Sequence, residues 1–202
     1  MVTAATQATK KSARKSDELL ARIIEIVRRT GLAGFSLETL APELGTSSRM
    51  LVYYFGSKDE LLGRIVYAVR SATVEAFASQ PAATITEAID HWWNYYRANM
   101  ADMQFFFHLA SRSFEEPDKF EEFSSTAVSV WTSYFHQSLH GVTKSDAEAQ
   151  AIARLALATV RGLMVDQLIT GETARVEEAL AEFKSLLGDR LSSPRGRRRT
   201  AR

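Results

Sequence analysis

The segment 47–55 places four chemically useful side chains on one face of a short amphipathic helix. Its buried face would consist of Leu51 and Phe55, with help from Val52. The opposite face carries Ser48, Arg49, Met50 and Tyr53. A guanidinium matches the two acceptors of guanine, a thioether can touch the methyl group of thymine, and hydroxyls donate to bases or phosphates. These side chains therefore predict contact with the edges of bases in a major groove.

Groups that favour phosphate lie at both ends of this segment. Thr46 or Ser47 can cap its first turn, and both hydroxyls stand beside the predicted base-facing side chains. Gly56 ends the segment, and Lys58 follows at the start of the next predicted helix. A lysine ammonium and the free N–H groups of a helix N-terminus both bind phosphate oxygens. We therefore expect this region to contact a nucleic-acid backbone.

Two preceding amphipathic helices would position the segment. They are predicted at about 17–30, capped by Ser16, and at 36–44, and their apolar residues recur three to four positions apart. The second helix and the segment, joined by 45–47, form a helix-turn-helix pattern, although such pairs also occur in ordinary helical bundles. Pro42 would remove one backbone hydrogen bond from the second helix and predicts a kink there.

The rest of the chain continues as helices, without the alternation typical of strands. Ser57, Thr84 and Ser145 each precede a glutamate by three residues, which predicts a capping box at three helix starts. The predicted later helices span about 58–79, 84–100, 102–114, 117–140 with Pro117 in the first turn, 146–170 and 173–190. We predict an all-α fold of about nine helices, with an N-terminal three-helix domain and a larger helical domain.

Charge is distributed unevenly along a chain whose formal net charge is only +1. Residues 1–70 contain 11 Lys and Arg against 7 Asp and Glu, residues 71–189 contain 8 against 17, and the tail 190–202 contains six Arg and no acid. A basic head and tail on an acidic body favour contact with a polyanion at one end. Two solvated tails without a partner are equally compatible with this composition.

Composition and motifs exclude several classes of site. The chain has no cysteine, so disulfides, thiolate catalysis and Cys-based zinc sites are absent. Paired-carboxylate motifs, a nucleophile elbow, a Gly-rich phosphate loop and HExxH are also missing, which predicts no enzyme and no cofactor. No apolar run reaches the roughly 18 residues that cross a bilayer, and we expect a cytoplasmic protein without a membrane partner.

Two histidines have a spacing that fits metal ligands. His136 and His140 stand four residues apart, on one face of a predicted helix. No third ligand is evident nearby, and an imidazole near a helix C-terminus is favourable on electrostatic grounds alone. We predict a pair of surface histidines and no metal site.

Aromatic residues gather in the second half of the chain. Thirteen of the 20 aromatic residues fall between Trp92 and Phe135. A core rich in rings explains this pattern, and so does a cavity for a flat or apolar small molecule. The residues predicted to line such a cavity are Trp92, Tyr96, Phe107, Trp131 and Phe135. Ring faces also attract cations, with Asp102 or Asp166 as the counter-charge.

Residues 51–62 read LVYYFGSKDELL, and residues 35–45 before them read FSLETLAPELG. Together they resemble the DNA-binding domain of the TetR (tetracycline-repressor) family, over about residues 17–63. The resemblance implies a homodimer that binds a palindromic operator in double-stranded DNA, usually as a repressor released by a small effector, here hydrophobic or aromatic. Matched by position, the base-facing residues are Ser48, Arg49, Met50 and Tyr53, and the phosphate contacts are Ser36, Tyr54 and Lys58. Val52 departs from the tyrosine that is usual there and removes one hydroxyl that commonly reaches a phosphate.

The sequence also predicts how the chain divides and pairs. Helix 146–170 is rich in small residues, which allow either close packing within one subunit or, with helix 173–190, a four-helix bundle across a twofold axis. The resemblance favours the dimer. The predicted regions are a disordered basic arm 1–15, a helix-turn-helix domain 16–62, a ligand-binding and dimerisation domain 63–190 and a disordered Arg-rich tail 191–202. The alternative is a dimeric DNA-binding regulator whose aromatic half binds no ligand.

Overall fold

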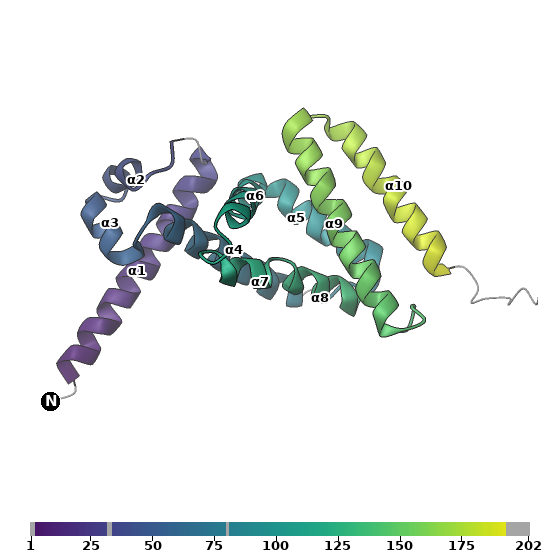
Figure 1. Ribbon diagram of the computed structural model, residues 1–202, viewed down its shortest axis with the longest axis horizontal. Coiled ribbons are helices and arrows are strands. Elements are labelled where there is room, and N and C mark those ends of the chain that lie inside the picture. Colours follow the sequence, from purple (N-terminus) through teal and green to yellow (C-terminus); the bar gives the residue numbers. More distant parts are fainter. Residues whose placement is uncertain (1–2, 32–33, 80, 193–202) are drawn as a thin grey trace, which may run out of the picture. The chain divides into compact units, whose positions relative to one another are not determined.

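The computed structural model describes residues 3–31, 34–79 and 81–192, and within these ranges every regular element is a helix (Figure 1). The helices are α1 Thr3–Thr30, α2 Leu37–Glu43, α3 Ser48–Phe55, α4 Lys58–Ala78, α5 Ile85–Ala98, α6 Met100–Glu115, α7 Glu121–Ala127, α8 Ser129–Gln137, α9 Asp146–Thr170 and α10 Thr173–Ser192. The predicted all-α class with about nine helices is confirmed, with one predicted helix divided in two. Across the described residues, no helix combines the length and apolar character that a membrane crossing needs.

Helix α1 begins much earlier than the sequence pattern predicted. Its first residue is Thr3, so Ser16 lies inside the helix instead of capping it, and the part of the expected disordered arm from 3 to 15 is helical. Alanine, lysine and arginine in this stretch have high helix propensity. Arg14 adds an ion pair with Glu18 one turn later, with the guanidinium Nε 3.3 Å from the carboxylate. The tail from 193 onward lies outside the described residues.

The predicted helix 117–140 is wrong at its start and in its continuity. Pro117 lies in a turn that precedes α7, where the N–H of Phe120 donates to the carbonyl of Pro117 at 3.2 Å. Val128 then separates α7 from α8. The segment between these points is rich in Ser and Thr, whose side chains compete with the backbone for hydrogen bonds and so weaken a helix.

Two compact units make up the described chain, one from residues within 1–76 and 96–125 and the other from residues within 77–95 and 126–192. The first unit has an apolar core beneath α3. Leu51 and Phe55 of α3 are fully buried there, together with side chains from α1, α2 and α4. Phe105 and Leu109 of α6 belong to the same core. Helix α6 is therefore packed into the helix-turn-helix region, although it is distant from that region in sequence.

Within the first unit, charged side chains also bind α6 to α1 and α4. Arg28 of α1 forms a bidentate ion pair with Asp102, at 2.9 Å from Nε to Oδ1 and 2.7 Å from Nη2 to Oδ2. The Asp102 side chain is fully buried, so water cannot bond to its carboxylate. The two N–H groups of Arg28 supply those hydrogen bonds instead. At the other end, Asp59 of α4 accepts hydrogen bonds from Lys119 at 2.7 Å and from Arg112 at 3.3 Å.

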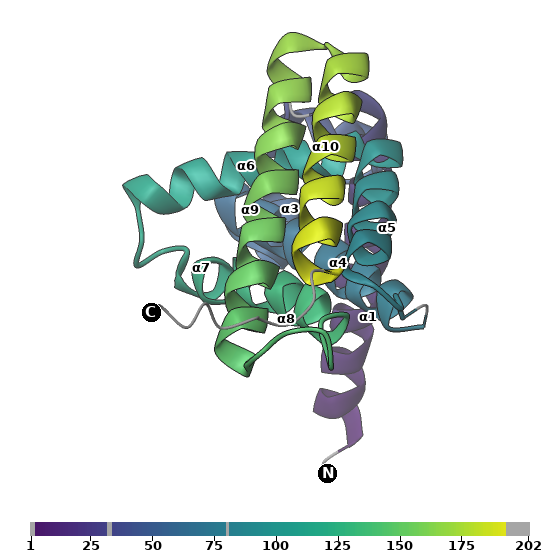
Figure 2. The same ribbon diagram turned by 90° about the vertical axis from the view of Figure 1, so that its right-hand side faces the viewer.

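The second unit is built on an antiparallel pair of long helices, α9 and α10, which Figure 2 shows side by side. Helix α9 begins at the cap Ser145, whose hydroxyl accepts a bond from the N–H of Glu148 at 3.2 Å. Gly171 ends it in the left-handed conformation, with φ 71°. These bounds confirm the predicted helix 146–170. The prediction succeeded because both caps are formed by residues next to the helix ends.

The carboxylate of Asp59 provides a test of the contact between α4 and the end of α6. Asp59→Asn should lower the free energy of unfolding by about 1–2 kcal/mol at neutral pH, because two charged donors lose their acceptor. The hydrogen bond from Lys119, assisted by Arg112, holds the pKa of Asp59 below its ordinary value. The stabilisation is therefore present above the pKa of an unfolded aspartate, about 3.9, and disappears as the pH falls through the lower folded pKa.

Urea unfolding of both proteins between neutral and acidic pH measures this difference. The two stabilities should converge in acid, and a difference that did not change with pH would contradict the assignment. Asp118→Asn is the matched control, because Asp118 is exposed in the same turn and should change stability by no more than about 0.5 kcal/mol.

Candidate nucleic-acid interface

Helix α3 is held by a cap at one end and by two buried anchors. Ser47 is its N-cap, and the Ser47 hydroxyl accepts a hydrogen bond from the N–H of Met50 at 3.3 Å. Gly45 has a φ of 63°, which allows the sharp turn between α2 and α3. Leu51 is 0% exposed and Phe55 is 1% exposed. The opposite face of α3 is therefore directed away from the core.

The outer face of α3 matches the prediction at Arg49, Met50 and Tyr53 and departs from it at Ser48 and Val52. Arg49, Met50 and Tyr53 are exposed, and Ser48 is half-buried. Val52 was expected to help the buried face, but its side chain is 51% exposed. Leu51 and Phe55, four residues apart, are sufficient to fill the core contact beneath α3. Val52 lies about 100° round the helix from Leu51. Its methyl groups join the outer face, where they suit contact with a thymine methyl.

Arg49 is available for a ligand outside the protein. Its side chain is exposed, and among the described residues it takes part in no hydrogen bond or ion pair. A planar guanidinium with unused donors can form two parallel bonds to the edge of a guanine. Tyr53 is 69% exposed, and its ring meets that of the half-buried Tyr54 edge-on, with the ring centroids 5.1 Å apart.

The predicted phosphate-binding groups near Lys58 differ in whether hydrogen bonds within the protein already occupy them. Lys58 is exposed at the first residue of α4, with its ammonium 5.6 Å from the ring centroid of Phe35. The backbone around it is partly occupied, because the Ser57 N–H donates to the Glu60 carboxylate at 2.8 Å and the Glu60 N–H donates to the Ser57 hydroxyl at 3.2 Å. This confirms the predicted capping box, and phosphate binding by the Lys58 ammonium remains a prediction.

Ser36 and Thr46 have structural roles beside the predicted ones. Ser36 caps α2 in a reciprocal box, in which its hydroxyl accepts from the Thr39 N–H at 3.2 Å and its own N–H donates to the Thr39 hydroxyl at 3.0 Å. Thr46 is half-buried in the turn, and its N–H donates to the carbonyl of Ala41 at 3.0 Å. Contacts of both hydroxyls with phosphate remain predictions.

The sequence pattern missed the residue that secures the turn from the α1 side. Arg22 of α1 donates to the carbonyl of Glu43 at 3.1 Å and to that of Leu44 at 3.3 Å. These carbonyls stand at the C-terminal end of α2, where no helical N–H remains to satisfy them. Helix periodicity places Arg22 on a polar face and cannot show that another helix ends beside it.

The residues predicted to line a cavity are mostly buried, and they belong to two units. Trp92, Trp131 and Phe135 lie in the second unit and are at most 3% exposed. Tyr96, also buried, and Phe107, half-buried, lie in the first. Asp102 is fully paired with Arg28, so the expectation that it serves as the counter-charge of a ligand is wrong. Asp166 is exposed.

A group of rings in the second unit centres on Phe77, which the prediction did not include. Its ring centroid lies 5.5 Å from that of Trp131 and 5.1 Å from that of Tyr134. The Tyr134 hydroxyl is 3.2 Å from Nδ1 of His91. Burial, with a smaller effect of the charge on Glu87, raises the pKa of Tyr134 to about 12, so this hydroxyl keeps its proton. Phe77 lies in the last turn of α4, and its position beside α8 could not be inferred from local spacing.

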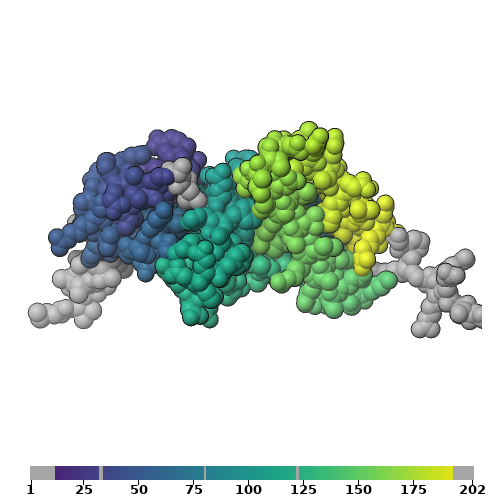
Figure 3. All heavy atoms as spheres, turned by 45° about the horizontal axis from the view of Figure 1, so that its top comes forward, coloured from purple at the N-terminus to yellow at the C-terminus, as the bar shows by residue number. Residues whose placement is uncertain are grey.

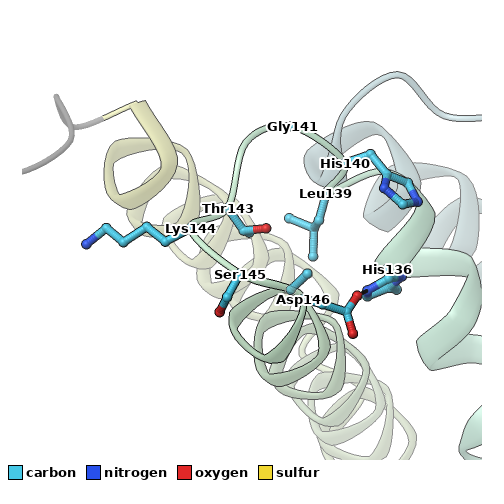
Figure 4. Close-up of a pocket in the computed structure, with 9 residues that line it drawn as sticks. His136, Leu139, His140, Gly141, Thr143, Lys144, Ser145 and Asp146 are labelled. Carbon is cyan, nitrogen blue, oxygen red and sulfur yellow. Dashed lines mark hydrogen bonds and ion pairs between the residues drawn. The ribbon is translucent and has the colours of Figure 1, made fainter.

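The two histidines border a shallow polar pocket of about 220 Å³ between α8 and α9 (Figure 4). Their rings meet edge-on, with centroids 5.5 Å apart, and His136 Nε2 lies 2.7 Å from the Asp146 carboxylate. Among the described residues, no group of three or more His, Cys, Asp or Glu side chains is placed to hold a metal ion. His136 is half-buried and His140 exposed, as expected for a pair near the surface.

Comparison with known proteins identifies the helix-turn-helix region. Residues 19–65 match the family described as bacterial regulatory proteins, tetR family. The match covers α2 and α3 completely, with most of the buried part of α1 and the start of α4. No curated protein matches the chain significantly.

Two substitutions on the exposed surface separate base contact from phosphate contact. Arg49→Ala should relax the preference for one base pair by about 1–3 kcal/mol, because the bidentate bond to guanine is lost. Lys58→Ala should weaken binding to all sequences about equally and reduce the salt dependence by the equivalent of about one phosphate contact. Competition binding assays against a panel of duplexes measure both effects.

Lys144→Ala is the control for charge, since Lys144 is an exposed lysine in the loop before α9. It should leave affinity and sequence preference unchanged. Equal losses for Arg49→Ala on every duplex, or a change of base preference with Lys58→Ala, would contradict these two roles.

Proposed function

Because residues 19–65 form the N-terminal helix-turn-helix domain of a TetR-family DNA-binding transcriptional regulator, we propose that the chain is a ligand-responsive repressor that binds a palindromic operator as a homodimer. The observation that carries this proposal is the outer face of α3, where Arg49, Met50 and Tyr53 are exposed above a rigid core. A single helix with such a face fits a major groove. Two copies about 34 Å apart would occupy successive turns of the duplex.

An exposed stripe on α9 supports the homodimer. It combines small and apolar residues at helical spacing, namely Ala151, Leu155, Ala158, Gly162 and Ile169. Leu155 is 56% exposed and Ile169 is 78% exposed, and Leu186 of α10 is 60% exposed. Figure 3 shows one face of α9 and α10, in light green and yellow. Large apolar side chains left in water on adjacent helices are typical of a subunit interface, and the small residues allow close approach of a partner helix.

Helix α6 supports a route from an effector to the DNA. It shares the core of the helix-turn-helix region and is bound to α1 through Arg28 and Asp102. A ligand that displaces α6 and tilts α4 would change the separation of the two α3 helices in a dimer. A coupling free energy of about 1–3 kcal/mol would weaken operator binding 5- to 150-fold.

The proposed effector is a small hydrophobic or aromatic molecule. Trp92, Trp131 and Phe135 offer apolar surface in the second unit, and the Tyr134 hydroxyl bonded to His91 offers a polar group. Tyr96 and Phe107 remain proposed liners. The chain contains three tryptophans, and all three are buried, so binding of such a molecule should change their fluorescence.

A regulator without an effector is the second candidate. Close packing of Phe77 with Trp131 and Tyr134 favours it, because rings that fill one another's space leave less room for a ligand. Titration with flat aromatic cations and with neutral apolar compounds discriminates the two. A saturable change in tryptophan fluorescence together with release of DNA supports the repressor with an effector, and neither change supports the second candidate.

Genomic footprinting with the purified protein tests the regulatory function itself. We expect protection of short palindromic segments, with two protected half-sites one helical turn apart. If the protein bound no duplex at low ionic strength, the proposed function would be wrong. A protein that binds an operator must share a compartment with the DNA. The cytoplasmic location expected from the sequence is therefore part of this proposal.

Gly162 provides a sharp test of the dimer. It lies in the exposed stripe of α9, and a Cβ added there would meet no atom within 4 Å. Gly162→Arg should therefore leave the fold of the subunit intact, while an unpaired charge in the interface costs about 3 kcal/mol or more. We expect the dimer to dissociate more than a hundredfold more readily, which sedimentation velocity measures.

Gln150→Arg is the matched control, because Gln150 is exposed on a different face of the same helix. This control should sediment as the wild-type protein does. Circular dichroism should show equal helix content in the wild-type protein, Gly162→Arg and Gln150→Arg. A dimer that survives in Gly162→Arg would place the interface elsewhere.

A further inference from the structure

The N-terminal part of α1 extends the helix-turn-helix domain beyond the family match. That match begins at residue 19, whereas α1 begins at Thr3. The added stretch contains four basic residues, Lys10, Lys11, Arg14 and Lys15. Figure 1 shows this end of α1 projecting beyond α3. The part of this stretch that lies beside α3 includes the basic residues Arg14 and Lys15.

Between this stretch and α3 lies an open groove of about 670 Å³. Its α1 wall consists of Ser12, Arg14, Lys15 and Glu18, and its α3 wall consists of Met50, Tyr53 and Tyr54. Both walls belong to the first compact unit. Met50 and Tyr53 also belong to the outer face of α3, so the groove and that face form one continuous surface.

The charges in the groove suit a polyanion. Glu18 is the single acid among the lining residues and faces two cations, Arg14 at 3.3 Å and Lys15 at 3.8 Å. These side chains are 83% and 52% exposed, and ion pairs so exposed contribute little stability. A phosphate can therefore replace Glu18 as their partner at small cost.

The α3 wall adds neutral hydrogen-bond donors. Among the described residues, the hydroxyls of Tyr53 and Tyr54 have no hydrogen-bond partner. Phenolic hydroxyls donate to the non-bridging oxygens of a phosphodiester, and aromatic rings tolerate contact with the sugar. Cations on one wall and free hydroxyls on the other are the groups that contact a DNA backbone.

We propose that this groove holds the sugar–phosphate backbone that borders the major groove occupied by α3, with Arg14 and Lys15 bound to its phosphates. The N-terminal part of α1 thereby lengthens the contact of each subunit with DNA outside the bases that α3 contacts. This inference rests on the proposed function, because α3 must lie in the major groove for the backbone to enter. Continuity with the base-facing surface favours DNA over an acidic peptide or an anionic membrane.

The salt dependence of binding tests the proposal without knowledge of the operator. The probe is a mixed-sequence duplex of about 40 base pairs, long enough for two half-sites. Binding constants are measured for the full chain between about 50 and 200 mM salt. Each phosphate contact contributes about 0.9 to the slope of log K against log salt concentration, so Arg14→Gln/Lys15→Gln should flatten the slope by about 3.6 in a dimer.

The matched control removes the same charges elsewhere. Arg175 is 77% exposed and pairs with Glu172 at 3.0 Å, much as Arg14 pairs with Glu18, and Lys144 is exposed. Arg175→Gln/Lys144→Gln should leave the slope unchanged. Equal slopes for wild-type and groove variants, or equal flattening in the control, would overturn the proposal, provided that circular dichroism shows all proteins folded.

The result also separates this proposal from the proposed function. If the wild-type protein binds the duplex and Lys58→Ala weakens binding, but Arg14→Gln/Lys15→Gln does not weaken it, only the groove assignment fails. If the wild-type protein binds no duplex at low salt, both fail. Binding of the wild-type protein to vesicles of anionic lipid that is stronger than its binding to the duplex would likewise overturn the choice of DNA.

A second measurement locates the groove on the DNA. Because the chain has no cysteine, Ser12→Cys creates a single thiol that can carry an iron-chelate cleavage reagent. On a duplex fragment recovered by genomic footprinting, cleavage should fall on the backbone flanking each half-site. The same reagent on Glu178→Cys of α10 is the control and should give no flanking cuts. Flanks left intact by the Ser12→Cys conjugate would contradict the proposal.

Discussion

Burial of Leu51 and Phe55 is the interaction on which the candidate interface depends. Helix α3 is only eight residues long, and a helix of that length is not stable alone in water. Its position comes from these two anchors in a core shared with α1, α2 and α4. Burial of each such side chain contributes about 1.5–3 kcal/mol, and together they determine which face of α3 remains outside. Exposure of Arg49 and Tyr53 follows from this arrangement.

The same core explains why α6 belongs to the DNA-binding part of the molecule. Phe105 and Leu109 extend the apolar contact to a helix about fifty residues beyond α3. Apolar contact alone permits sliding, whereas the bidentate bond between Arg28 and Asp102 has one geometry. A displacement of α6 therefore has to move α1 or break a buried ion pair. This coupling is the physical basis of the proposed response to an effector.

The local pattern of the sequence was sufficient for elements that end in their own caps. Helix α9 has its predicted bounds because Ser145 and Gly171 act on the backbone beside them. The outward position of Arg49 was also predictable, since two apolar residues four positions apart define the buried face of α3. The pattern failed at Val52, where hydrophobicity suggested burial although Leu51 and Phe55 already fill the core contact beneath α3.

The sequence by itself determined the all-α class, the helix-turn-helix and the outward position of Arg49, Met50 and Tyr53, because periodicity and caps act over a few residues. Only the tertiary structure decided that α6 shares the core of that domain, that Arg22 satisfies the end of α2 and that a basic groove lies between α1 and α3. These features join residues that are distant in the chain. Their contacts depend on how helices pack, and the order of residues along one helix does not specify which other helix it meets.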